Sequence, residues 1–516
     1  MKDTHYERLA ELTEKLTGKE LKAGREHLRR FRHQNRKKGS LLELFERVIK
    51  DGHLSVDAFY DAYYKKRISR KAFFQNCRRA QKRLMEALLM DPVAEDPDSF
   101  SRSSRIKLRI NKELLSCRIL ISRGCTRNAF ELLNRSVREA ERMELYDELI
   151  EALTIERNIS GTRFGATKFR SYDRSIRFYE DCRAALQRAV DYYHRFFVEF
   201  EDFTGNNNKK VGFLTEALSQ LEADVKRTGS ERIKEFLLEL KILYANTVEE
   251  HEQSWRMGEQ LLALVKGSKA LYTERKEADI RQDIGDNLLF LHHLEPIEDH
   301  LQLPLKLYPK GDFDHLQTLE VLFLKHYYAG EIERANEVLE KEIIPSTDPD
   351  NTPFLANKWA YYRAVLALIK GDPKKAIRYL ERTELLDPDK ESWNLWVRFL
   401  GIMASIEAGD LDQAEHRSES ARKDLERARK NGAEPSKRDQ LILRILRSLE
   451  LLDHDLELLV TECADELNRL RSSETGMRWE VKTPELIVFP DWIRDRAAGT
   501  PYRFRFSEKE KEKEPL

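Results

Sequence analysis

The chain has 516 residues, 35% of them charged, and its 91 Lys and Arg balance its 91 Asp and Glu. Its 21 Gly and 15 Pro amount to about 7% of the chain, roughly half of average usage. This excludes collagen-like and Pro-rich architectures and argues against an all-β fold, which needs many turns. A hydrophobic fraction of 41% can bury a core in so long a chain, which argues against wholesale disorder.

Several targeting and stabilising devices are missing from the sequence. The first residues, MKDTHYERLAELTEKL, contain no apolar run of the kind that a secretory signal needs. No stretch approaches the ~18–20 uncharged apolar residues that cross a bilayer. The 5 cysteines are scattered without a CxxC pair, which disfavours a disulfide framework or a zinc site. We therefore expect a cytoplasmic protein with no metal, no cofactor and no membrane contact.

The N-terminal part of the chain is basic. Residues 1–112 hold 28 Lys and Arg against 16 Asp and Glu, a balance of +12, which leaves −12 for the rest. We expect residues 1–40 to form a basic helical lead. Residues 41–104 are expected to form a small helical module ending in the linker DPVAEDPDSFSRSS. A basic part on an acidic body predicts either an anionic partner or contact between the two parts, within or between chains.

The last helix of this module is expected over residues 69–90 and is amphipathic. At 100° per residue, one side carries the apolar residues Phe73, Cys77, Ala80, Leu84 and Leu88. The other side carries Lys71, Gln75, Arg78, Arg79 and Lys82. A basic helix after a short turn is the arrangement of a recognition helix in a DNA major groove. A solvated helix face that is basic is the simpler interpretation, and we prefer it. Lys71, Arg78, Arg79 and Lys82 are the candidate contacts to an anionic partner.

One short pattern recurs further along the chain: Gly, four residues, Ala, and then an apolar residue about four positions later. It occurs as GCTRNAFELL, GEIERANEVL, GDPKKAIRYL and, more weakly, GDLDQAEHRS. The residues that carry it are Gly124 and Ala129, Gly330 and Ala335, Gly371, Ala376 and Leu380, and Gly409 and Ala414. By subtraction of their numbers, the last three glycines are 41 and 38 residues apart, the size of a two-helix repeat.

Each occurrence has a physical interpretation as a pair of helices. An apolar stripe at helical spacing precedes Gly330, Gly371 and Gly409. Glycine adopts a positive φ without strain and so ends the first helix, while the small alanine lets the second helix approach closely. A single pair cannot bury its stripe alone, so the pairs must stack. We expect a solenoid over residues 105–475, a C-terminal cap region over 476–506, and a disordered charged tail over 507–516.

Residues 357–390 resemble the tetratricopeptide repeat. With Gly371 at the turn of that repeat, Ala364 and Ala376 stand at its small positions, Leu380 at its large apolar position and Pro388 at its closing proline. The resemblance implies an all-α solenoid of degenerate tetratricopeptide-like helix pairs, whose surface binds a peptide or a helix. The order of elements also resembles a family of helical-repeat proteins of about this length in Bacteroidetes. That family has no established activity, so it implies nothing chemical.

The sequence contains no recognisable catalytic motif. There is no GxSxG elbow, and HHLEPIEDH at residues 292–300 lacks the spacing of an HExxH metal site. We therefore predict a non-enzymatic protein–protein interaction scaffold or adaptor. Two alternatives stay open: a nucleic-acid-associated regulator that uses the basic helices within residues 1–112, and an enzyme with an unrecognised site.

Overall fold

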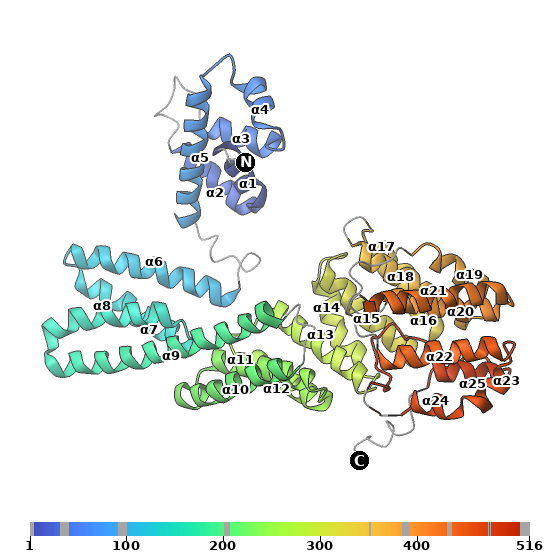
Figure 1. Ribbon diagram of the computed structural model, residues 1–516. Helices are drawn as coiled ribbons and strands as arrows, with labels where there is room; N and C mark the ends of the chain where they lie inside the picture. Colours follow the sequence, from blue (N-terminus) through green and yellow to red (C-terminus); the bar gives the residue numbers. More distant parts are fainter. Residues whose placement is uncertain are drawn as a thin grey trace. The chain divides into compact units, whose positions relative to one another are not determined.

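A computed structural model (Figure 1) describes the chain over residues 5–30, 41–90, 101–200, 207–349, 352–383, 393–430, 436–472, 474 and 476–505. Every regular element in these residues is helical, and consecutive helices pack against each other as pairs. The expected all-α class is therefore confirmed. The predicted linker spans residues 91–104, of which 91–100 lie outside the described residues. Its last residues are not a linker, because Ser101 is the N-cap of α6 (Arg102–Ser122) and residues 102–104 form its first turn. The predicted tail over 507–516 also lies outside the described residues.

The helices belong to two units. Unit 1 comprises Met1–Val190, Asp224–Ile233 and Ser268–Thr273, and unit 2 comprises Asp191–Ala223, Lys234–Gly267 and Glu274–Leu516. The division passes within long helices, whereas the sequence led us to expect one continuous array from residue 105 to residue 475. Periodicity identifies helices well, but it carries no signal for which consecutive pairs share a core.

The N-terminal module consists of α1 (His5–Lys15), α2 (Gly18–Arg29), α3 (Leu41–Asp51), α4 (Val56–Tyr63) and α5 (Arg70–Met90). The segment expected as a separate lead belongs to the same core, because Tyr6, Leu9 and Leu28 pack with Phe45 and the apolar side of α5. Gly24 explains how α2 fits there. A Cβ on it would lie 2.7 Å from Leu84 Cδ2 and 3.3 Å from Phe45 Cζ, so a larger residue here would require these side chains to move.

The remaining helices of unit 1 are α6 (Arg102–Ser122), α7 (Thr126–Arg142), α8 (Tyr146–Phe164) and the first part of α9 (Ala166–Phe200). The turn after α7 contains Glu144, whose side chain binds the N-terminus of a helix that lies much further along the chain. The Glu144 carboxylate accepts hydrogen bonds from the Ser230 hydroxyl (2.7 Å) and from the backbone N–H groups of Glu231 (2.8 Å) and Arg232 (3.0 Å). These are donors that a helix N-terminus leaves without partners, so Glu144 caps α11 (Glu231–Thr247).

The helices after α9 continue as pairs, and we call the first helix of each pair the A-helix. The A-helices are α11 (Glu231–Thr247), α13 (Glu274–Phe290), α15 (Phe313–Tyr328), α18 (Pro353–Ile369), α20 (Trp393–Glu407) and α22 (Lys437–Leu451). The other elements are α10 (Asn208–Thr228), α12 (His251–Gly267), α14 (Ile297–Leu307), α16 (Ile332–Glu337), the π-helical turn η3 (Val338–Ile343), α17 (Ile344–Ser346), α19 (Pro373–Leu380), α21 (Leu411–Lys430), α23 (Leu456–Glu462), α24 (Ala464–Arg469) and α25 (Phe489–Ala497).

The turn after an A-helix has one geometry throughout unit 2. After α15, α18 and α20 the turn residue is Gly330, Gly371 or Gly409, with φ of 75°, 77° and 74°. In each turn the following N–H donates to the carbonyl five residues back, as from Asp372 to Ala367 at 2.9 Å. This is the bond of a Schellman motif, which satisfies a carbonyl at the helix end.

The same turn recurs after α11, α13 and α22, where the sequence pattern is silent. There the left-handed residue is Glu249 (φ 60°), His292 (φ 61°) or Asp453 (φ 51°), and the same backbone bond spans five residues. By subtraction, consecutive turn residues from 249 to 453 are 38 to 44 residues apart. The repeat therefore extends over six consecutive pairs, of which glycine marks only three.

The small residues of the pattern lie where it places them. Ala129, Ala335 and Ala376 have no exposed surface, and Ala414 is 1% exposed. Leu380 is also buried. Gly124, the first glycine of the pattern, adopts a positive φ in the turn after α6. One boundary was wrong. The pattern extends the helix that contains Ala376 to Pro388, but α19 ends at Leu380, whose carbonyl accepts a hydrogen bond from the Thr383 hydroxyl at 2.6 Å. Pro388 itself lies outside the described residues.

The turn glycine gives a test with a matched control. We expect Gly371→Ala to lower the free energy of unfolding by about 1–2 kcal/mol, because the new Cβ has open space but the left-handed backbone is strained. Gly212→Ala in α10 also adds a Cβ in open space, on a backbone without positive φ, and is expected to stabilise by up to about 1 kcal/mol. Urea unfolding of both variants measures the difference, and equal effects would contradict the turn assignment.

A second test addresses the packing of α19. Ala376→Trp places a large side chain where nothing is exposed to solvent, so we expect a loss of about 1–3 kcal/mol through overpacking. Lys374→Trp, two residues away at an exposed position, is the control and should change the melting temperature little. An unchanged melting temperature for Ala376→Trp would show that the pair does not pack at this alanine.

Candidate functional site

The A-helices of unit 2 share a face that another part of the chain crosses. Residues 478–488 are non-helical and precede α25, and we call them the C-terminal segment. Side chains of α13, α15, α18 and α22 bond to this segment or to the residues just before it. The sequence led us to expect that residues 476–506 pack back as a terminal cap. In the structure the described residues of this region, 476–505, lie across consecutive A-helices rather than only on the last one.

Tyrosine hydroxyls hold the backbone of the C-terminal segment. Tyr327 on α15 donates to the Leu486 carbonyl at 2.8 Å, and Tyr361 on α18 donates to the Pro484 carbonyl at 2.6 Å. The Tyr328 hydroxyl accepts from the backbone N–H of Lys482 at 3.3 Å. Burial raises the pKa of Tyr327 and Tyr361 well above the usual value, so both hydroxyls stay protonated donors. Because these bonds reach the backbone, they place few demands on side-chain identity.

A buried ion pair fixes the segment to α22. The Arg438 guanidinium donates to Glu485 at 2.7 Å, with side chains only 7% and 3% exposed. The same guanidinium donates to the carbonyls of Leu470 (2.6 Å) and Met477, and Glu485 also accepts from the backbone N–H of Phe489 at 2.9 Å. A buried charge is tolerated only when hydrogen bonds and an opposite charge satisfy it, as they do here. The pair therefore specifies one position for the segment.

A second polar network lies between α13, α15 and α18. The Glu320 carboxylate accepts from Lys358 (2.9 Å) and Tyr362 (2.5 Å), and Lys482 of the segment donates to Asp286 at 2.8 Å. Desolvation acts to raise the pKa of Glu320, but the charges of Lys358 and Lys482 and the hydrogen bonds outweigh it, so the pKa is lowered. The carboxylate therefore stays ionised, and Lys482 contributes to the same electrostatic network.

Beyond Lys482 the A-helix face is acidic. We call Glu235 and Glu239 on α11 and Asp279, Asp283 and Asp286 on α13 the acidic cluster. Glu235 pairs with Lys276, Asp279 with Arg275 (2.9 Å) and Asp286 with Lys482. The carboxylates of Glu239 and Asp283 have no ion-pair partner among the described residues, and Glu239 Oε2 is a buried atom without a hydrogen bond there.

The two unpaired carboxylates are electrostatically destabilised. The pKa of Glu239 rises to about 8, first through desolvation and then through Glu235. The pKa of Asp283 rises to about 7, through desolvation and then through Asp286 and Asp279. The Asp283 residue is nevertheless exposed, so solvent screens its charge and the ionised form costs far less than that of Glu239. The unpaired part of this face would thus gain from a cation.

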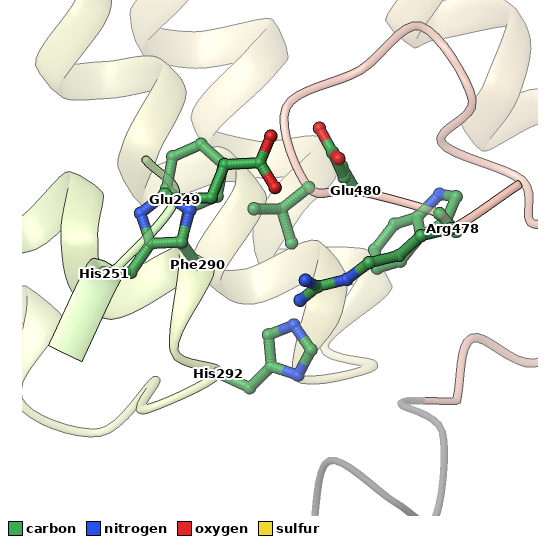
Figure 2. A pocket seen from close by; sticks show the side chains of 8 residues that line it. Glu249, His251, Phe290, His292, Arg478 and Glu480 are labelled. Atoms are coloured by element: carbon green, nitrogen blue, oxygen red, sulfur yellow. The ribbon is translucent and has the colours of Figure 1, made fainter. Parts of the chain in front are cut away.

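A small cavity lies where the C-terminal segment meets the turns after α11 and α13 (Figure 2). Its volume is about 30 Å³, and its lining comprises Glu249, His251, Phe290, His292, Arg478, Trp479, Glu480 and Val481. The rings of His251 and Phe290 stack with centroids 4.4 Å apart, and desolvation lowers the pKa of His251. Such a space holds about one water molecule, far less than the ~300 Å³ of a small-molecule site. The cavity therefore lacks room for a metabolite.

In the described part of the chain, no group of three or more His, Cys, Asp or Glu is placed to hold a metal ion. No described helix is both long and apolar enough to cross a bilayer.

The sequence-predicted anionic contacts lie elsewhere, on α5 of the N-terminal module. Lys71, Arg78, Arg79 and Lys82 are all exposed there. Sequence reasoning did not find the A-helix face. Its carboxylates on α11 and α13 fall in helices without a motif, and Tyr327 and Tyr361 lie in pattern-bearing pairs but not at the positions that define the pattern. The only signal was the aromatic stretch ELIVFPDWI, which contains Glu485 and precedes no repeat.

The chain matches no protein-family model, and no curated protein sequence matches it either. Its function must therefore be inferred from the chemistry of its own surfaces.

The acidic cluster predicts a pH dependence of stability. A carboxyl group whose folded pKa lies above its unfolded value stabilises the fold only while protonated, so stability falls as pH rises from about 4 toward 8. We expect Glu239→Gln to be more stable than the wild type by on the order of 1 kcal/mol near pH 8.5, and nearly equal to it below about pH 4.5. Urea unfolding at both pH values measures this.

Glu216→Gln on α10 is the control, because its side chain is exposed. It should shift stability by the same small amount at both pH values. A Glu239→Gln variant with an unchanged pH profile would show that this carboxylate is not destabilised in the fold.

Proposed function

We propose that unit 2 is a non-enzymatic interaction scaffold whose A-helix face holds a polypeptide segment of a partner protein. One observation carries this proposal: the A-helices already hold a non-helical segment of this chain through its backbone. Tyr327 and Tyr361 bind the carbonyls of Leu486 and Pro484, and Arg438 binds those of Leu470 and Met477. A surface that hydrogen-bonds to backbone carbonyls in this way can bind a peptide without regular secondary structure.

The part of the face available to a partner lies toward α9, α11 and α13. Residues 484–490 of the chain are buried, so the C-terminal segment is a fixed part of unit 2. All members of the acidic cluster except the buried Glu235 keep contact with solvent, as does Tyr193 on α9. Tyr193 lies beside Phe236 with ring centroids 5.6 Å apart. An aromatic ring beside unpaired carboxylates favours a segment that carries Lys or Arg. The likeness of residues 357–390 to a tetratricopeptide repeat supports the same mode of action.

The proposal is tested by placing a photo-crosslinking phenylalanine analogue at Tyr193 in the native cell and identifying what becomes attached. Tyr379 on α19 is the matched control, since it is also a partly exposed tyrosine but lies on a second helix of a pair. We expect one recurring protein adduct from position 193 and none from position 379. Equal labelling from both positions, or no protein adduct at position 193, would overturn the proposal.

A further inference from the structure

The N-terminal module uses one side of α5 for its core and leaves the opposite side to solvent. Phe73, Cys77 and Ala80 have no exposed surface, and Leu84 is 1% exposed. We call the opposite side the basic stripe. It comprises Lys71, Gln75, Arg78, Arg79 and Lys82, all exposed. At 1.5 Å per residue the stripe covers about 16 Å of helix, so its charges form one continuous surface.

The cations of the basic stripe are not neutralised by the module. Their neighbours Arg70 and Arg83 pair with Asp57 and Glu86, whereas the four cations of the stripe have no ion-pair partner in the described part of the chain. The reason lies in the sequence, because no Asp or Glu occurs from residue 70 to residue 85. Positions one helical turn away on α5 therefore supply no carboxylate to Lys71, Arg78 or Arg79. Lys82 is the exception, since Glu86 stands four residues on and its carboxylate, hydrogen-bonded to Arg83, also interacts with the charge of Lys82.

Another helix of this chain shows the usual alternative. On α21, Arg422 lies between Glu419 and Glu426 and hydrogen-bonds to both, so its charge is balanced on its own helix. Such pairing at spacings of three and four residues is the common arrangement on a solvated helix surface. Lys71, Arg78 and Arg79 have no such partner on α5, which separates the stripe from a helix face that is merely solvated. An external polyanion would satisfy these charges.

We propose that the basic stripe of α5 binds the phosphate backbone of a nucleic acid duplex. A duplex presents one negative charge per about 1.7 Å of its axis, so a stripe of about 16 Å meets several phosphates. This contact requires no shape complementarity beyond the regular spacing of the phosphates. The planar guanidinium groups of Arg78 and Arg79 suit phosphate oxygens. Helix α5 follows α4 after a short turn at residues 64–69, the order of elements in which the second helix enters a major groove. Gln75 stands within the stripe, where an amide can reach a base edge.

The test uses the full chain, a fluorescently labelled 20-base-pair DNA duplex and anisotropy titrations from about 50 to 200 mM salt. If all four cations contact phosphates, the logarithm of the association constant should fall with a slope of up to about 3.6 per log unit of salt. Replacing Arg78, Arg79 and Lys82 with Gln should weaken binding at least tenfold at low salt and reduce that slope by up to about 2.7.

The matched control removes the same charge elsewhere. Lys374, Arg378 and Arg382 are exposed residues of α19 and the turn after it, and their replacement by Gln should leave affinity and slope unchanged. Circular dichroism verifies that both triple variants stay folded. The proposal is overturned by absence of duplex binding at 50 mM salt, by equal losses in the two variants, or by a polyglutamate chain that competes as well as the duplex. That last result would assign the stripe to an acidic protein.

Discussion

One backbone constraint determines how unit 2 is built: the chain must pass through a left-handed residue after every A-helix. Glycine does this without strain, whereas another residue costs roughly 1–2 kcal/mol in that conformation. Glu249, His292 and Asp453 occupy the position nonetheless, with the same backbone hydrogen bond as at Gly371. The packing of helix on helix therefore outweighs the local preference, and the turn geometry does not require glycine.

The turns bring the A-helices onto a common face, and that face has two chemically different parts. Toward α15, α18 and α22 its polar groups are satisfied by residues 470–488, through Tyr327, Tyr361 and the buried pair of Arg438 with Glu485. Toward α11 and α13, the carboxylates of Glu239 and Asp283 have no ion-pair partner within the described part of the chain and interact with Lys276 and Lys482 only at a distance. A site for another molecule belongs in the second part, because groups already paired gain little from a ligand and unpaired ones gain more.

The sequence was sufficient for the fold class and for the turns at Gly124, Gly330, Gly371 and Gly409, because glycine at a left-handed position leaves a local signal. It did not reveal the turns at Glu249, His292 and Asp453, where tertiary packing replaces that signal. The buried side of α5 could also be predicted, since Phe73, Cys77, Ala80 and Leu84 follow a 3.6-residue period. The contacts of Tyr361 with Pro484 and of Arg438 with Glu485 span 123 and 47 residues, and no periodicity encodes such pairings.

The position of the C-terminal segment in the chain bears on how the protein is made. Because synthesis runs from the N-terminus, α15 and α18 leave the ribosome well before residues 478–488 do. Until then the hydroxyls of Tyr327 and Tyr361 lack the carbonyls that accept their hydrogen bonds, and Arg438 lacks its ion-pair partner Glu485. A nascent array in this state exposes apolar and polar surface that the finished unit buries. Unit 2 thus reaches its native packing only after nearly all of its helices have been translated, and a chain that terminates early would be a substrate for chaperones and proteases.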